Sequence, residues 1–308
     1  MTEAPSVPAA TTESATPMSV LHIGHMVVEG TTIRAEQQLC ARFADHRGRI
    51  DLPALGVLFD HVAGIPFFRL GAEAGALSMQ ARLAMSGLGH IDVDEKISCS
   101  AEVVMHDDGT GITTVDIRTS DGTLGCTGLA RNMRVARPAA GDEDETPIAV
   151  DTPDCDGHGI ELPGPVPAHL DGRDVIAEIA EGRRPIGPLA ELLGGRIEFD
   201  GDTGMLRFTA ATDPWMANVF GTMHGGVIAT IIGQAFSLAG QAHAAAGKDY
   251  RVGDLTFGFY RSPAVGGVDV VVDVTPVKIG RRIAAFRATM VDADGKLLAD
   301  GSADIHYS

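Results

Sequence analysis

The 308-residue chain is poor in aromatic and basic residues. Aromatic residues make up 5% of it against 44% apolar residues overall, so we expect a largely aliphatic core. Lys and Arg total 24, whereas Asp and Glu total 41, which leaves a net charge of −17. This shortage of positive charge argues against non-specific nucleic-acid binding and against docking on an anionic membrane, because both require a basic surface.

Cysteine is also scarce, and no two cysteines form a C-x-x-C pair. The four are Cys40, Cys99, Cys126 and Cys155. Few scattered thiols in a chain of this length predict a reduced protein with a cytoplasmic location. Residues 1–19 are rich in Ala, Ser, Thr and Pro and lack a basic stretch followed by an apolar one. They therefore predict a disordered tail rather than a signal peptide.

Long runs without charge are almost absent, and the exception is Gly225–Gly247, which contains no Asp, Glu, Lys or Arg. Its length would suffice to cross a membrane. It nevertheless carries polar side chains and has no adjacent basic cluster, so a buried helix is the better interpretation. The polar residues are Gln234, Ser237, Gln241 and His243.

Composition divides the chain into two domains. Residues 138–170 are acidic and then proline-rich, and such a stretch cannot bury enough apolar surface to fold alone. We therefore expect a first domain over 20–137, a linker over 138–170 and a second domain over 171–308.

The two domains show the same order of patterns, with an apolar helical run followed by alternating segments. The helical runs are 52–68 and 225–246. Alternation and β-branched residues predict four strands after each run. These are 76–85, 96–105, 112–119 and 124–135 in the first domain, and 250–260, 268–277, 283–291 and 297–307 in the second.

One constant offset aligns the two domains. The hairpin turns Asp121–Leu124 and Asp294–Leu297 share the pattern Asp-Gly-x-Leu and lie 173 residues apart. The same offset places Gly48 opposite Gly221 and Asp51 opposite His224 without a gap. We therefore interpret the chain as a tandem duplication of one α+β unit.

The sharpest motif is Asn218-Val-Phe-Gly221-Thr-Met-His224-Gly225-Gly226, directly before the charge-free helix. This stretch resembles the PaaI-like hotdog-fold thioesterases, in which N-x-x-G-x-x-H-G-G opens a central helix. The resemblance extends over nearly all of 188–306 and includes 255–263, 279–282 and the Asp-Gly hairpin. It implies a double hotdog, an α+β fold with two tandem antiparallel sheets, each wrapped around a central helix.

In the family that this motif resembles, an acidic residue nine positions after the His directs water or itself attacks a thioester carbonyl. Backbone N–H groups at the helix start polarise the carbonyl oxygen. The physics is consistent, because the first N–H groups of a helix are unsatisfied and carry partial positive charge. Glycines there also allow a ligand to approach the backbone closely.

Each domain departs from this pattern in a complementary way. Nine residues after His224 stands Gly233, followed by Gln234, so the second domain lacks the acid. Nine residues after Asp51 stands Asp60, but Leu52 and Pro53 replace the glycines in the first domain. Nine residues of helix span roughly 13 Å, so an acid and a helix start must meet across two helices. We expect one composite site that combines the acid of the first domain with the helix start of the second, and a second site without activity.

The expected catalytic residues are Asp60, His224, Gly225 and Asn218. Asp60 would be the general base or the nucleophile, the Gly225 N–H would stabilise the oxyanion, and the other two would position carbonyl and water. The candidates for substrate binding are Gly226, Arg261, Arg281 and Arg282. The three arginines are included because Arg suits the phosphates of CoA. His61 and Asp51 are more simply explained as a satisfied histidine and a helix cap.

The resulting prediction is an acyl-CoA thioesterase that acts on an apolar acyl group. It needs no metal and no cofactor beyond the CoA of its substrate, and double hotdogs of this kind could pair as homodimers. Two alternatives stay open: a non-catalytic acyl-CoA-binding or regulatory protein, and a hydratase of the same fold. A hydratase would need an Asp and a His a few residues apart, which the adjacent Asp60 and His61 do not supply.

Overall fold

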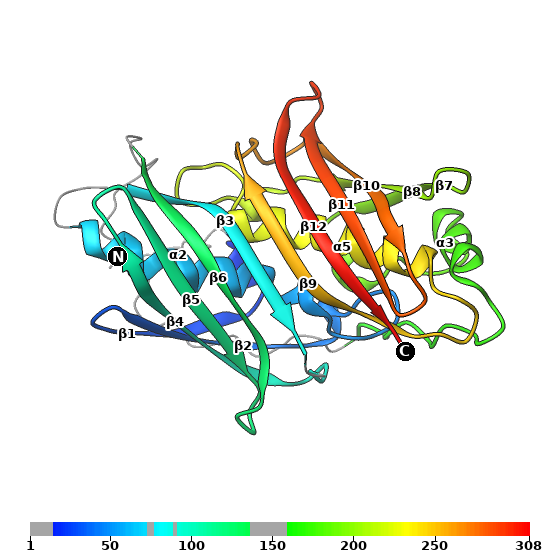
Figure 1. The fold of residues 1–308 in the computed structure, drawn as a ribbon, viewed down its shortest axis with the longest axis horizontal. Helices are drawn as coiled ribbons and strands as arrows, with labels where there is room; N and C mark the ends of the chain where they lie inside the picture. The colour runs from blue at the N-terminus through cyan, green and yellow to red at the C-terminus, as the bar shows by residue number, and fades with distance from the viewer. Residues whose placement is uncertain (1–14, 73–76, 89–90, 136–158) are drawn as a thin grey trace, which may run out of the picture.

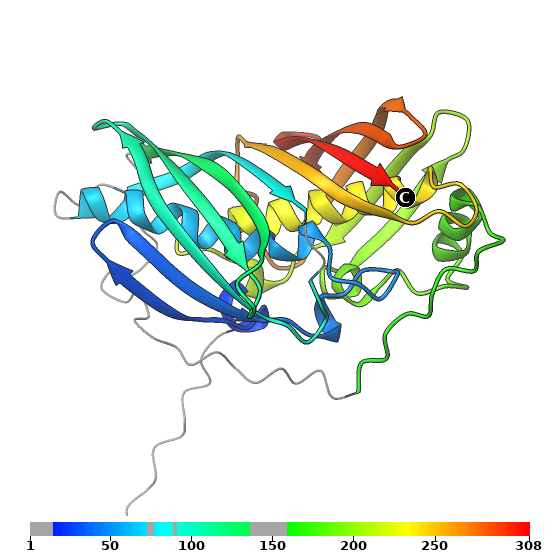
Figure 2. The ribbon, with the colours of Figure 1, turned by 60° about the horizontal axis from the view of Figure 1, so that its bottom comes forward.

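A computed structural model describes residues 15–72, 77–88, 91–135 and 159–308. In these residues, one antiparallel sheet of twelve strands curves around two long helices, α2 (Gly56–Ala72) and α5 (Gly225–Ala242). Figures 1 and 2 show the two helices lying along the long axis of the molecule, each covered by its own half of the sheet. The predicted double hotdog is therefore present.

The two halves are built from equivalent sets of six strands. The first half contributes β1 (Ile23–Glu29), β2 (Thr32–Gln38), β3 (Leu77–Gly87), β4 (Lys96–His106), β5 (Thr110–Arg118) and β6 (Leu124–Val135). The second contributes β7 (Gly195–Asp200), β8 (Met205–Ala211), β9 (Tyr250–Phe259), β10 (Asp269–Ile279), β11 (Ile283–Asp292) and β12 (Leu297–Tyr307). The sheet order is β1-β2-β4-β5-β6-β3 followed by β9-β12-β11-β10-β8-β7. The second order is the first one reversed, as an internal two-fold axis requires.

The two sheets that the repeat predicted are joined into one. β3 pairs with β9 from Arg82 opposite Gly258 to Ser86 opposite Asp254. Sequence patterning could not indicate this seam, because periodicity identifies strands but not which edges meet. The seam and the helices together make the two halves one continuous core.

The local sequence explains why both helices form where they do. α5 begins at the glycine pair after the cap His224, and its residues are buried from Gly226 to Ala242. A short 3₁₀ helix, Leu52–Leu55, precedes α2; its cap Asp51 accepts a hydrogen bond from the Leu52 N–H, and Pro53 lies in its first turn. Within the described residues, Leu52–Gly71 is long and apolar enough to cross a membrane, and 61% of this stretch is buried inside the molecule.

Glycine allows the two long helices to cross closely. A Cβ at Gly226 would lie 2.5 Å from the Val57 Cα, and one at Gly56 would lie 2.7 Å from the Thr230 Oγ1. Neither distance is tolerated between real atoms, so the crossing needs a residue without a side chain on each helix. This contact brings the start of α5 against the first turns of α2.

Three shorter helices complete the described structure: α1 (Pro17–Val20), α3 (Gly172–Ala180) and α4 (Pro188–Leu192). The predicted tail was wrong for its last residues, because α1 begins at Pro17 and is stabilised by a capping box between Thr16 and Ser19. α3 covers the end of α5, where the Gly172 N–H donates to the Ala244 carbonyl at 2.8 Å. The rest of the predicted tail and residues 138–158 of the predicted linker lie outside the described residues.

The cysteines do not all behave as expected. Cys99 and Cys126 are free and buried, and burial raises the pKa of the Cys126 thiol to about 12. Cys40, however, is disulfide-bonded, so the prediction of four reduced thiols was wrong. Spacing along the chain could not reveal this bond, because disulfide formation depends on the distance between Cα atoms in the folded protein.

Candidate active site

A carboxylate from the first half meets the helix start of the second. The Asp60 Oδ2 atom, on α2, accepts a hydrogen bond of 2.6 Å from the Gly226 N–H on α5. Asp60 is 4% exposed. The acid and the helix start that the sequence places in different halves therefore lie in direct contact across the helix crossing.

His224 adds its imidazole to this contact. Its Nδ1 accepts a hydrogen bond of 3.0 Å from the same Gly226 N–H and lies 3.1 Å from the Asp60 Oδ2. The residue is 9% exposed, and burial, together with the neighbouring His61, lowers its pKa to about 3. The ring is therefore neutral at physiological pH, and it caps α5 while contacting the carboxylate.

The environment of Asp60 keeps its proton affinity high. Burial raises the pKa of its carboxyl to about 7, and the hydrogen bond from Gly226 opposes this rise only in part. Its second oxygen, Oδ1, is buried and has no hydrogen-bond partner among the described residues. An uncompensated buried carboxylate is costly, so this atom is a candidate for contact with water or a ligand.

The Gly225 N–H completes a possible oxyanion site. It is the first N–H of α5, and no hydrogen bond among the described residues uses it. A Cβ at this position would lie 3.0 Å from both oxygens of Asp60. Only a glycine leaves room here for a carbonyl group to approach the N–H and the acid together.

Gly226, predicted to bind substrate, directs its N–H at the acid in this structure, and its role in substrate binding stays a prediction. Its N–H is shared between Asp60 and His224, at 2.6 and 3.0 Å. That N–H therefore orients the acid and is not available to a ligand. The motif alone could not separate the two glycines, because both N–H groups lie in the first turn of the helix.

Asn218 shapes the loop before α5. Its Oδ1 accepts hydrogen bonds from the Phe220 and Thr222 N–H groups at 2.9 and 3.2 Å, and its Nδ2 lies 3.4 Å from the Met223 carbonyl. The side chain is committed to its own loop. Among the described residues it therefore positions the chain that leads to His224 and forms no hydrogen bond with Asp60.

His61 lies closer to the site than the sequence suggested. Its ring centroid is 6.0 Å from that of His224, and it is only half-buried. Burial lowers the pKa of its imidazole to about 4. The only sequence signal was its position next to Asp60, which does not show which way a helical side chain points.

The equivalent position in the other half contains none of these groups. By the repeat, Pro53 corresponds to Gly226 and Gly233 to Asp60. These two residues also touch across the helix crossing, since a Cβ at Gly233 would lie 2.8 Å from the Pro53 Cβ. Proline has no N–H to donate and glycine has no acid, so this second contact has the right geometry without the chemistry.

The loops before the two helices have kept the same shape. Asp45 accepts from the N–H groups two and four residues later, at 2.7 and 3.2 Å, as Asn218 does. Gly48 and Gly221 have φ values of 73° and 71°, in the left-handed region. The duplication is therefore visible at the level of single hydrogen bonds.

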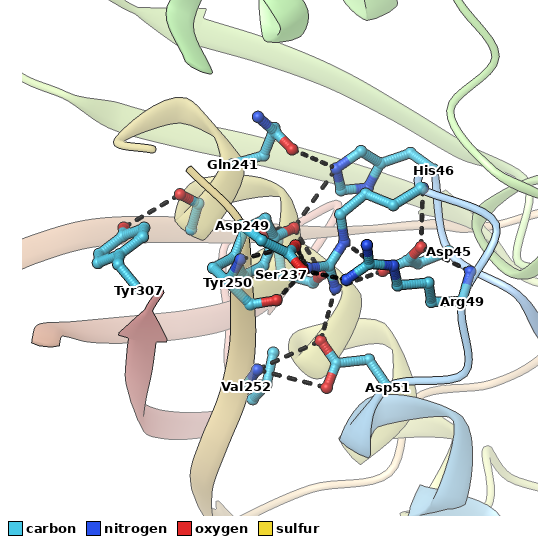
Figure 3. Close-up of polar contacts among 12 residues, drawn as sticks. Asp45, His46, Arg49, Asp51, Ser237, Gln241, Asp249, Tyr250, Val252 and Tyr307 are labelled. Carbon is cyan, nitrogen blue, oxygen red and sulfur yellow. Dashed lines mark hydrogen bonds and ion pairs between the residues drawn. The ribbon is translucent and has the colours of Figure 1, made fainter. Parts of the chain in front are cut away.

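In the first half this loop contains a buried ion-pair network. One guanidinium nitrogen of Arg47 lies 2.6 Å from Asp45 and 2.7 Å from Asp51, and the group stacks over the Tyr250 ring at 3.7 Å. Burial alone would raise the pKa of Asp45, but Arg47 holds it below the ordinary value. Asp51 also accepts from the Val252 N–H, as Figure 3 shows. This end of the molecule, which lacks the acid, is thus filled by paired charges.

A second buried contact in Figure 3 joins the halves. The His46 Nε2 lies 3.1 Å from the Gln241 Oε1 and 3.4 Å from the Tyr250 hydroxyl, which donates to the Ser237 carbonyl at 2.6 Å. Burial lowers the pKa of His46 to about 4. The sequence indicated none of this network, because His46 lies 195 residues from Gln241 and 204 residues from Tyr250.

The three predicted arginines do not gather at Asp60. Arg261 donates to the Leu297 carbonyl at 3.1 Å. It lies at the same end of the sheet as Pro263, whose carbonyl accepts a hydrogen bond from the Met223 N–H. Arg281 and Arg282 form the turn between β10 and β11, at the opposite end of β11. A ten-residue strand is roughly 30 Å long. Within one chain Arg281 and Arg282 therefore lie far from Asp60, and their role in substrate binding stays a prediction.

Comparison with known proteins agrees with this architecture. Residues 220–299 match the family model of the thioesterase superfamily. The chain is similar to the tesB protein of Mycobacterium avium subs paratuberculosis, with a TM-score of 0.58, 11% identity, and 92% of this chain and 96% of that chain covered. No match was found among curated proteins.

Two further solved structures are similar over most of their length. One is a conserved protein of unknown function with hot dog fold from Alicyclobacillus acidocaldarius, with a TM-score of 0.57, 13% identity and coverage of 92% and 95%. The other is an acyl-ACP thioesterase from Bacteroides thetaiotaomicron VPI-5482, with a TM-score of 0.54, 11% identity and coverage of 90% and 98%. At these identities the likeness establishes the fold, two hotdog units in one chain.

Proposed function

We propose that this tandem hotdog protein, whose second half belongs to the thioesterase superfamily, hydrolyses the thioester bond of an acyl-CoA at one composite site. The observation that carries the proposal is the contact of the buried Asp60 carboxylate with the first turn of α5. An acid, a free N–H at a helix start and a neutral imidazole lie together there. These are the groups that acyl transfer to water requires.

In the proposed reaction, the thioester carbonyl oxygen accepts a hydrogen bond from the Gly225 N–H. Ionised Asp60 takes a proton from a water molecule through its unpartnered Oδ1, and the water oxygen attacks the carbonyl carbon. The negative charge that develops on the carbonyl oxygen is stabilised by the positive end of α5. Collapse of the intermediate breaks the C–S bond, the thiolate takes up a proton, and a carboxylic acid and free thiol leave.

Asp60 can also act as the nucleophile. Its Oδ1 would then attack the carbonyl, expel the thiolate and form a mixed anhydride, which water hydrolyses in a second step. Incubation in ¹⁸O-labelled water over a single turnover separates the two routes, because only the anhydride route can place the label in the protein carboxyl. Both routes need Asp60 ionised.

The surroundings of Asp60 support an apolar acyl group. His61, Ile65 and Phe68 follow one face of α2 at intervals of four and three residues, and all three are half-buried. This face begins beside the catalytic pair. An aliphatic or aromatic acyl group lying along it would cover the exposed part of an otherwise buried helix.

The decisive experiment is a thiol-release assay over acyl-CoAs of increasing chain length. We expect Asp60→Asn to reduce turnover by at least about a hundredfold while substrate binding is retained. The matched control is Asp51→Asn, because Asp51 is the counterpart of His224 at the inactive end and contacts Arg47 instead. Loss of turnover in both variants, with both folded, would rule out a single composite site.

The same panel tests the two alternatives. Binding of acyl-CoA by wild-type protein with no thiol release from any chain length would favour a binding or regulatory role. Hydration of an enoyl-CoA, followed by the loss of absorbance of its conjugated double bond, would favour the hydratase. Neither result is expected from a site in which an acid lies beside the free N–H of Gly225.

A further inference from the structure

The hairpin between β10 and β11 carries an exposed apolar and basic tip. Residues 277–283, called the basic tip below, contain no acid, and all but Gly280 are exposed. The exposed fractions of its three aliphatic side chains are 59%, 43% and 52% for Val277, Ile279 and Ile283. Its three cations are Lys278, Arg281 and Arg282, and none of them forms an ion pair within the described residues. Such a concentration of positive charge is unusual in a chain of net charge −17.

The equivalent hairpin of the first half, between β4 and β5, carries the opposite charge. Residues 104–109, called the acidic tip below, correspond to the basic tip by the repeat offset and are all exposed. Val104 and Met105 are 57% and 66% exposed. Asp107 and Asp108 stand where the basic tip has Gly280 and Arg281. Both tips therefore present bare aliphatic side chains, and they differ in the sign of their charge.

The internal two-fold axis sets the two tips at opposite ends of the molecule. β4 with β5 and β10 with β11 are equivalent hairpins in a sheet whose halves have reversed order. Figure 1 shows these hairpins on opposite flanks of the sheet. The tips of one chain cannot meet each other, so their complementary surfaces face outward.

We propose that the basic tip of one molecule docks on the acidic tip of a second copy of this chain. Contact buries aliphatic side chains that each monomer leaves in water, and it pairs cations with carboxylates. Tips of like charge repel, so the pairing is directional. Because each chain carries both tips, two copies aligned antiparallel make the contact twice and close as a two-fold dimer.

Sedimentation velocity of the full chain tests this interface. We expect wild-type protein to dimerise at low ionic strength and to dissociate as salt rises, since exposed ion pairs are screened. The variant K278E/R281D/R282D has two acidic tips, and the variant D107K/D108K has two basic tips. Each alone should dissociate with a Kd raised by at least about tenfold. An equimolar mixture of the two should dimerise again, because every contact then pairs opposite charges.

A control variant and an independent readout keep the result interpretable. Lys296→Glu changes an exposed cation in the β11–β12 hairpin, at the other end of β11, and should leave the dimer unchanged. Thermal unfolding of every variant establishes that it is folded. Wild-type protein that stays monomeric at low salt, or a mixture that fails to associate, would overturn the proposal. Neither outcome depends on whether the chain hydrolyses thioesters.

Discussion

At the scale of single residues, Asp60 combines two opposing requirements. The proposed reaction needs the ionised carboxylate, whereas burial at 4% exposure favours the neutral acid. The helix N–H of Gly226 compensates only in part, and the pKa of Asp60 stays near 7. Such a residue is poised to gain or lose a proton near neutral pH, which suits a general base.

The pH dependence of turnover should report this carboxyl. Below pH 7 Asp60 becomes protonated, so we expect kcat/KM to fall about tenfold per pH unit well below an apparent pKa near 7. His224 and His61, with pKa values of about 3 and 4, do not titrate in this range. Rates measured from pH 5 to 9 would contradict this assignment if they were flat or fell with rising pH.

Removing the charge of Asp60 should stabilise the protein at high pH. Its pKa is raised from 3.8 to about 7 on folding, so its contribution to stability is fully present below pH 3.8 and is lost as pH rises through 7. The loss above pH 7 is on the order of 4 kcal/mol. Asp60→Asn lacks this titration, and its free energy of unfolding should exceed that of wild type most at pH 8. Urea unfolding at pH 5 and pH 8 measures the difference, which should shrink at the lower pH.

At the scale of elements, the glycine pair at the start of α5 divides two tasks. Gly226 allows α2 and α5 to cross, because its missing Cβ would lie 2.5 Å from the Val57 Cα. A Cβ at Gly225 would instead lie 3.0 Å from both carboxyl oxygens of Asp60. One glycine is thus needed for packing and the other for access to the acid, although the sequence presents them as one motif.

Alanine substitutions should separate these tasks. Gly226→Ala forces the helices apart, and we expect it to cost about 1–3 kcal/mol of stability or more. Gly225→Ala should change stability by less than about 1 kcal/mol, because the carboxyl group can move and alanine favours a helix. It should nevertheless lower kcat/KM at least about tenfold, since the methyl group occupies the approach to the N–H. Thermal unfolding and thiol release on both variants test the distinction, and equal effects on stability would contradict it.

Most elements were predicted from the sequence because their patterns are local. Strands β6 and β12 were predicted with the bounds that the structure shows, and buried valines alternate along β10 as expected. The first helical run was only partly right, because Pro53 makes its start a 3₁₀ turn and the α-helix extends to Ala72. α3 was not predicted, although Asp171 caps it and its buried residues Val175, Ile176 and Ile179 recur at helical spacing.

At the scale of the whole molecule, the end that lacks the acid holds the halves together. Arg47 of the first half stacks on Tyr250 of the second, pairs with two buried carboxylates and has a side chain that is only 6% exposed. The opposite helix crossing keeps an unpartnered carboxyl oxygen, Oδ1 of Asp60. Duplication thus allowed the groups of the proposed site to remain at one end while the other end acquired an ion-pair network.

Loss of this contact should affect stability but not chemistry. Arg47→Met leaves the buried Asp45 and Asp51 without the cation that they share, which we expect to cost about 3–5 kcal/mol. Arg49→Met is the matched control, because Arg49 pairs with Asp249 at the surface and should contribute about 1 kcal/mol or less. Urea unfolding measures both variants. A fall in kcat of folded Arg47→Met to the level of Asp60→Asn would show instead that the network serves catalysis.

The sequence by itself determined the duplication, the two helices, most strands and the pairing of an acid from one half with a helix start from the other. These features follow from spacing, periodicity and the offset of 173 residues, all of which are local or strictly repeated. Only the tertiary structure decided which glycine N–H is free, where Arg281 and Arg282 lie, and that Arg47 fills the inactive end. The physical reason is that contacts across the helix crossing and the sheet seam join residues far apart in the chain, and few aromatic or basic residues were present to mark them.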